Sequence, residues 1–220
     1  INSNGAELIS LKDNKTGKEY MWNGNPDFWA KHSPILFPIV GTLKNNSYLY
    51  NNEEYHLSRH GFARDNVFEI IYQKDNEVVF SLKSNNETLQ HYPFQFELQI
   101  KYAISENDLH ITYSVFNEND FQMPFSIGGH PAFALDKNFE NYALEFETDE
   151  TLEYYPLEND LLSNQSLKIH LKEKTLPLTY SLFENDALVF KQLNSISILL
   201  KENDSPILNF SFKDFPNFGI

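Results

Sequence analysis

Apolar and polar residues alternate with a period of two along much of the chain. Residues 94–102 (FQFELQIKY) alternate without a fault, and residues 109–115 (LHITYSV) follow the same pattern. This period is typical of a strand that has one buried face and one wet face. Because the polar residues 105–108 between them predict a turn, we expect the two segments to form an antiparallel hairpin.

The same pattern predicts two further hairpins, and helical signals are few. Residues 67–72 are expected to pair with 78–82, and residues 196–200 with 207–212. Short helical turns are predicted at 25–31 and at 86–92, the second stopped by Pro93. Hairpins in series predict an all-β fold, a large antiparallel sandwich. No linker composition or repeat divides the sequence, so residues 1–220 are predicted to form a single domain.

Composition narrows the classes of function. The chain has 220 residues, 41% of them hydrophobic, which is ample for a core. A formal net charge of −14 argues against nucleic-acid and membrane partners, because both require basic patches. The absence of cysteine, of a long apolar run and of a basic leader predicts a soluble, cytoplasmic protein. The first residue is not methionine and the last residues are apolar, so we expect strands to be missing at both ends.

The stretch 125–133 (FSIGGHPAF) places His130 between a glycine pair and Pro131. Glycine allows positive φ and the close approach of another group, whereas proline fixes φ and stops a strand. Such a bent backbone can aim an imidazole at a substrate. An ordinary structural turn or bulge is the alternative interpretation.

A second histidine, His60, lies close to both arginines of the chain. The segment 58–65 (SRHGFARD) contains Arg59 and Arg64. Because a guanidinium is a planar fork of donors suited to oxygen-rich partners, this segment predicts a polar binding wall. The structural alternative is that Arg64 pairs with Asp65 or another carboxylate. Two histidines with a carboxylate would suit proton transfer between oxygens near neutral pH.

The other histidines provide no further candidate for a functional site, and the sequence has no clear motif for binding a metal or a phosphate. We interpret the remaining histidines as surface or turn residues: His32, His56, His91, His110 and His170. Only His56 and His60 have a spacing that metal ligands use, and their segment lacks the helical pattern that would face them one way. No glycine-rich phosphate loop and no GxSxG motif occurs in the sequence. The sequence therefore predicts neither a metal site nor a cofactor site.

Four motifs in order give the chain a resemblance to a known family. They are PILFPIVG at 34–41, RHGFARD at 59–65, GGHPAF at 128–133 and FENDALVF at 183–190. This set resembles the aldose 1-epimerases, and more narrowly their galactose mutarotase-like, LacX-like branch. The resemblance covers nearly the whole chain, and the second and third motifs together are fairly specific. It implies a β-supersandwich with an open sugar cleft that uses no metal and no organic cofactor.

The resemblance also implies a reaction and the residues that perform it. Members interconvert the α and β anomers of a free aldose such as galactose or glucose. By this resemblance, His130 and His60 are the catalytic residues: His130 protonates the ring oxygen, and His60 orients the sugar and helps at the ring oxygen. Asp186 binds the sugar hydroxyls. Arg64 is expected to contact the sugar or support His60. We expect His60, His130 and Asp186 to line one concave surface of about the size of a pyranose.

Two departures from the family pattern leave an alternative open. Members commonly carry arginine after the glycine of the FPIVG stretch, where this chain has Thr42. Their base is a glutamate that follows a stretch like residues 215–220, so it is expected beyond Ile220 and no residue here takes that role. The alternative is therefore a non-catalytic sugar-binding or sugar-sensing module on the same fold. The sequence does not identify the sugar, its phosphorylation state, the oligomeric state or the pathway.

Overall fold

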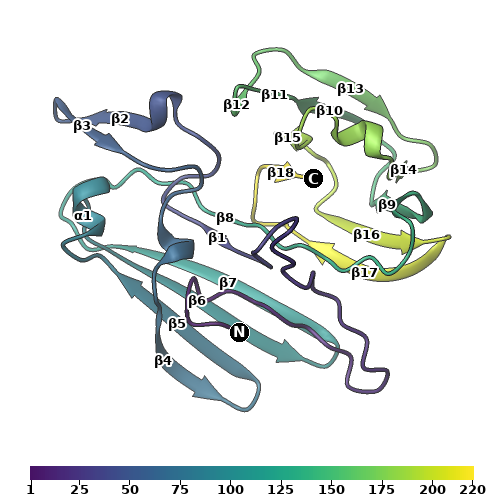
Figure 1. Ribbon diagram of the computed structural model, residues 1–220, viewed down its shortest axis with the longest axis horizontal. Helices are drawn as coiled ribbons and strands as arrows, with labels where there is room; N and C mark the ends of the chain where they lie inside the picture. Colours follow the sequence, from purple (N-terminus) through teal and green to yellow (C-terminus); the bar gives the residue numbers. More distant parts are fainter. The chain divides into compact units, whose positions relative to one another are not determined.

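A computed structural model describes all residues from Ile1 to Ile220 (Figure 1). Its contacts divide the chain into two compact units, Ile1–Ala134 and Leu135–Ile220. Each unit consists of antiparallel sheets, and the one α-helix spans four residues. The predicted all-β class is therefore confirmed. The single domain over residues 1–220 stays a prediction.

The first unit contains strands β1 to β8, one short α-helix and two 3-10 turns. The strands are β1 (Ile35–Leu36), β2 (Ser47–Tyr50), β3 (Glu53–His56), β4 (Glu69–Lys74), β5 (Glu77–Lys83), β6 (Phe96–Ser105), β7 (Asp108–Asn117) and β8 (Gly128–Gly129). The helical elements are η1 (Lys44–Asn46), η2 (Ala63–Asp65) and α1 (Thr88–His91). The second predicted helical turn is thus α1. The first, at 25–31, is a single turn in which Phe28 and Trp29 both donate to the Asn25 carbonyl.

The main sheet of this unit has the strand order β4-β5-β6-β7 (Figure 1). The hairpins predicted at both ends of this sheet are confirmed, because β4 pairs with β5 and β6 pairs with β7. In β6 the alternate residues Phe96, Leu98, Ile100 and Tyr102 are buried, and the polar residues between them are partly exposed. The N-terminal segment packs on this sheet, where Tyr102 donates its hydroxyl to the Ala6 carbonyl at 2.8 Å.

The second unit contains strands β9 to β18. They are β9 (Tyr142–Phe146), β10 (Thr151–Tyr155), β11 (Leu157–Glu158), β12 (Leu161–Leu162), β13 (Leu167–His170), β14 (Thr175–Pro177), β15 (Val189–Phe190), β16 (Ser197–Glu202), β17 (Ser205–Ser211) and β18 (Phe218–Gly219). Two 3-10 turns, η3 (Phe139–Asn141) and η4 (Tyr180–Phe183), complete it. The predicted third hairpin is β16 with β17.

Stacked aromatic rings join the two four-stranded sheets of the second unit. One sheet has the order β14-β9-β16-β17 and the other β13-β10-β15-β18. The Phe218 ring of β18 stacks on Phe212 at 4.2 Å and on Phe190 of β15 at 6.5 Å, and it also contacts Phe210 of β17. Large rings suit this position because each one removes a large apolar area from water.

Many of the tight turns use residues that tolerate a left-handed backbone. Five pairs of successive non-glycine residues have positive φ: Asn45–Asn46, Asn51–Asn52, Asn159–Asp160, Glu173–Lys174 and Asn203–Asp204. Two-residue hairpin turns need positive φ at both central positions, which asparagine and aspartate adopt more readily than most residues. Asparagine and aspartate provide both residues in four of these pairs, and Glu173–Lys174 is the exception. No helix of the structure is long or apolar enough to cross a membrane.

Candidate functional site

The segment Pro34–Gly41 connects both histidine motifs in the first unit. On one side, β1 pairs with β8, with Ile35 opposite Gly129. The backbone N–H of His130 donates to the Pro34 carbonyl at 3.1 Å. Most of this segment is buried, from Pro34 to Pro38. The first three residues of the GGHPAF motif are thus bound to a buried segment of the chain.

The same segment also binds the HGFAR motif. Phe37 donates its N–H to the His60 carbonyl at 3.2 Å, and its own carbonyl accepts from Phe62 and Ala63. Neighbouring residues of an extended chain direct their backbone polar groups to opposite sides, so one short segment can bind two others. The ring centroids of His60 and His130 consequently lie 5.9 Å apart. The structure therefore brings the two predicted histidines together.

His60 is held by reciprocal hydrogen bonds with Gly41. The His60 N–H donates to the Gly41 carbonyl at 2.8 Å, and the Gly41 N–H donates to His60 Nδ1 at 3.0 Å. A backbone N–H can only donate, so Nδ1 must accept and the proton of the neutral ring lies on Nε2. The residue adopts φ of 70°, a left-handed conformation that few side chains adopt. His60 is thus fixed as a donor through Nε2.

The structure corrects one of the two reasons expected for the glycine pair before His130. Neither Gly128 nor Gly129 has a positive φ; both are ordinary residues of β8. The reason for glycine is the close approach of another group, because a Cβ at Gly129 would lie 2.7 Å from the Tyr113 hydroxyl. Burial raises the pKa of Tyr113 to about 12, so this hydroxyl stays protonated at neutral pH. The predicted close approach is therefore made by the protein itself.

The close approach of Gly129 to the Tyr113 hydroxyl predicts that a second substitution can restore lost stability. We expect Gly129→Ala to destabilise the protein by about 1–3 kcal/mol, the usual cost of overpacking a site that is already filled. Tyr113→Phe removes the clashing oxygen, after which the nearest ring carbon lies at an ordinary 3.6 Å. The double variant should therefore be more stable than Gly129→Ala alone in urea unfolding. Additive effects of the two changes would show that this contact does not matter.

Arg64 supports the backbone around His60. Its Nη2 donates to the carbonyl of Arg59 at 2.9 Å, directly before the histidine. Its Nε lies 3.6 Å from Asp65, which also pairs with Lys31 at 2.9 Å. The structural alternative raised by the sequence, a pair with Asp65, is therefore present. These contacts fit the expectation that Arg64 supports His60; its contact with a sugar stays a prediction.

Asp186, the proposed sugar-binding carboxylate, belongs to a different unit from the two histidines. Asp186 lies in the second unit, after η4, where it is exposed and its Oδ1 accepts the N–H of Ala187 at 2.8 Å. Its place beside the histidine pair stays a prediction.

Thr42 follows Gly41, and its hydroxyl oxygen is buried without a hydrogen-bond partner. The Thr42 hydroxyl is therefore not presented to solvent.

Sequence reasoning missed Trp29. Its ring lies against His130, with centroids 4.9 Å apart and planes inclined by 43°. The sequence signal was slight: one of only two tryptophans lies in a turn otherwise interpreted as a short helix. Trp29 therefore packs directly against one of the two histidines.

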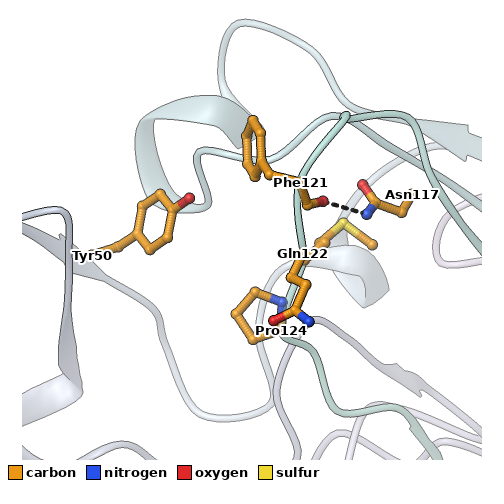
Figure 2. Close-up of a pocket in the computed structure, with 6 residues that line it drawn as sticks. Tyr50, Asn117, Phe121, Gln122 and Pro124 are labelled. Carbon is orange, nitrogen blue, oxygen red and sulfur yellow. Dashed lines mark hydrogen bonds between the residues drawn. The ribbon is translucent and has the colours of Figure 1, made fainter.

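A surface hollow of about 700 Å³ lies in the first unit, and no residue of the two histidine motifs lines it. Figure 2 shows Tyr50 facing Phe121 across it, with Gln122 and Pro124 on the same wall. The amide of Asn117 donates to the Phe121 carbonyl at 2.7 Å. The lining of this hollow carries no carboxylate, histidine or cation. No group of three or more His, Cys, Asp or Glu side chains has the arrangement of a metal site.

Comparison with known proteins gives consistent relatives. The family described as Aldose 1-epimerase matches residues 1–217. The plasmid-encoded protein LacX of Lactococcus lactis subsp. lactis is 38% identical over 228 residues, which cover 97% of this chain and 76% of LacX. A solved galactose mutarotase related enzyme from Lactobacillus acidophilus has a TM-score of 0.94 and 36% identity, covering 100% of this chain and 75% of that chain. For a galactose mutarotase-like protein from Lactobacillus casei, the TM-score is 0.92 at 30% identity, with coverages of 100% and 77%.

Proposed function

Because the chain belongs to the aldose 1-epimerase family, we propose that it interconverts the α and β anomers of a free aldose such as galactose or glucose. The observation that supports this proposal most is the pair of imidazoles, 5.9 Å apart and joined through one buried segment. His130 is exposed and His60 is half-buried, so a substrate has access to the pair. A bound sugar would thus meet one solvent-facing imidazole and one oriented donor.

The proposed reaction opens and recloses the sugar ring. A base removes the proton of the C1 hydroxyl, and C1 becomes a carbonyl carbon as its bond to the ring oxygen breaks. The bonding electron pair stays on the ring oxygen, which takes a proton from His130. Rotation about the C1–C2 bond and reversal of these steps close the ring on the other face. No atom is gained or lost, which agrees with an isomerase.

The remaining roles follow the family resemblance. His60 would donate from Nε2 to a sugar oxygen, because Gly41 occupies its Nδ1. Arg64 and Asp186 are proposed to bind the sugar, Arg64 also by supporting the loop of His60. The base is proposed to be a glutamate that follows residues 215–220, and none of the 220 residues is assigned this role.

Two replacements of His60 distinguish the roles of its two ring nitrogens. Asparagine places an oxygen near Nδ1 and tolerates positive φ, so His60→Asn should keep the bond from Gly41 and fold normally. It loses the donor at Nε2, and we expect anomer exchange to fall about 10²-fold, as when an aligned donor is removed. Glutamine instead reaches the Nε2 position and leaves the Gly41 N–H unpaired, so His60→Gln should retain more activity but melt lower. The reverse ranking of activities would exclude the proposed donor role.

The function itself is tested with the protein expressed from its complete gene. Polarimetry of freshly dissolved α-D-glucose and α-D-galactose measures how fast each reaches anomeric equilibrium. The proposal expects acceleration well above the buffer rate for at least one sugar. Sugar binding measured by calorimetry, without acceleration of anomer exchange, would instead support the non-catalytic sugar-binding module. The departure from the family pattern that belongs to this alternative is Thr42, which stands where members commonly carry arginine.

A further inference from the structure

Trp29 makes direct ring contact with the proposed acid. The 4.9 Å separation and 43° inclination bring the indole against the imidazole of His130 without a parallel stack. Trp29 is partly exposed and His130 is exposed, so the two rings share a surface that a solute can reach. An indole in this position restricts the rotation of the imidazole on one side. The indole therefore lies at the same surface as the His130 ring.

The position of Trp29 is fixed by bonds that lead back to the His130 segment. Trp22 donates its backbone N–H to the Ala132 carbonyl at 2.9 Å, two residues beyond His130. The Trp22 indole N–H then donates to the Trp29 carbonyl at 2.9 Å. The Trp29 N–H donates to Asn25 at 2.9 Å, which closes the turn. Trp29 and His130 are therefore held against each other by a continuous set of contacts within the first unit.

We propose that Trp29 is the aromatic wall of the sugar site, which holds the His130 ring and packs against the apolar face of the pyranose. The inference deepens the proposed function and rests on it for the identity of the ligand. Trp29 acts on the acid as a positioning residue and on the sugar as a binding residue.

The chemistry of a pyranose fits such a wall. A sugar ring presents hydroxyls at its rim and a patch of C–H groups on its face. The electron-rich face of an indole attracts these C–H groups, and small-molecule sites commonly combine aromatic walls with a few polar groups. Here the polar groups are His60 and His130, whose rings lie 5.9 Å apart, and Trp29 borders the second. A sugar that offers its ring oxygen to His130 would therefore lie within reach of the indole.

Kinetics of Trp29 variants separate the two parts of this role. For Trp29→Ala we expect the KM to rise about tenfold, the range of one lost aromatic contact, and kcat to fall as well, because the acid is no longer held. Trp29→Phe should restore kcat to within about threefold while KM stays raised, because a smaller ring still restrains His130 but covers less of the sugar. Phe28→Ala is the matched control. It removes an 80% exposed ring from the same turn; this ring lies edge-on to Trp22 at 6.3 Å, whereas the ring against His130 is that of Trp29.

Two measurements do not depend on turnover. In the sugar-free protein, the indole ring current should shift the NMR signals of the His130 ring protons, assigned by their loss in His130→Asn. This shift should disappear in Trp29→Ala and remain in Phe28→Ala. Because the chain has only two tryptophans, the fluorescence difference between wild type and Trp29→Phe gives the emission of Trp29. Galactose or glucose should change that emission.

The outcomes distinguish this inference from the proposed function. An active wild type whose Trp29→Ala variant has unchanged kcat and KM overturns the inference and leaves the function intact. A wild type that is inactive, but in which sugar changes the Trp29 emission, supports the wall and refutes the anomer exchange. Absence of any sugar response in all of these proteins overturns both.

Discussion

Replacing His130 with asparagine should lower the rate of anomer exchange by about 10²–10⁴-fold, or roughly 3–5 kcal/mol of barrier, while the protein folds normally. Asparagine keeps similar size and some hydrogen bonding but cannot deliver a proton to the ring oxygen. The side chain is exposed, and the backbone bond from His130 to Pro34 does not depend on the ring. The packing that changes is the ring contact with Trp29, so the fold should tolerate the change and most of the loss should lie in chemistry.

Polarimetry and thermal unfolding together test this expectation. His110→Asn is the matched control, because His110 is an exposed histidine of β7 and has no proposed role. It should leave the exchange rate unchanged. If His130→Asn equilibrates the anomers as fast as wild type, His130 is not the acid. A large fall in melting temperature would instead assign the loss of activity to the fold.

The strands were predictable because their signal is local. In β6 the alternation of apolar and polar residues matches the alternation of buried and partly exposed side chains. A shift of the strand register by one residue would turn each buried side chain outward and each exposed one inward. The turns were predictable for a similar reason, since asparagine and aspartate tolerate the left-handed backbone of tight hairpin turns. The division of the contacts into two units had no such local signal, because no linker composition marks the boundary near Ala134.

The site was predictable only in part, because its geometry depends on pairing between distant segments. The motifs indicated His60 and His130, but no periodicity showed that Phe37 and Pro34 bind the two histidine segments. Two reasons were expected for the glycine pair, positive φ and the close approach of another group; the structure shows only the second, and at Gly129 the group is the Tyr113 hydroxyl of β7. Trp29 was missed because a ring contact between residues far apart in sequence leaves no pattern.

The largest effect on stability is expected at Gly61, in the HGFAR motif. Gly61 has φ of +71°, and a Cβ there would lie 2.2 Å from the Phe37 carbonyl oxygen and 2.7 Å from the Pro38 ring. These atoms belong to backbone and to a buried proline, so they cannot turn aside as a flexible side chain would. Separating them would break the bonds from Phe62 and Ala63 to Phe37. Gly61 is therefore required for the two histidine motifs to meet.

Gly61→Ala should cost about 4 kcal/mol or more, at the upper end of single substitutions and a large part of a typical total of about 5–15 kcal/mol. Gly17→Ala is a matched control, because Gly17 has nearly the same φ, +72°, and no atom within 4 Å of the added Cβ. It should cost only about 1–2 kcal/mol, the penalty of the left-handed backbone itself. Urea unfolding of both variants measures the difference, which isolates the contact with Phe37. Equal losses at the two glycines would show that the backbone conformation alone matters and that Phe37 and Gly61 do not have to approach so closely.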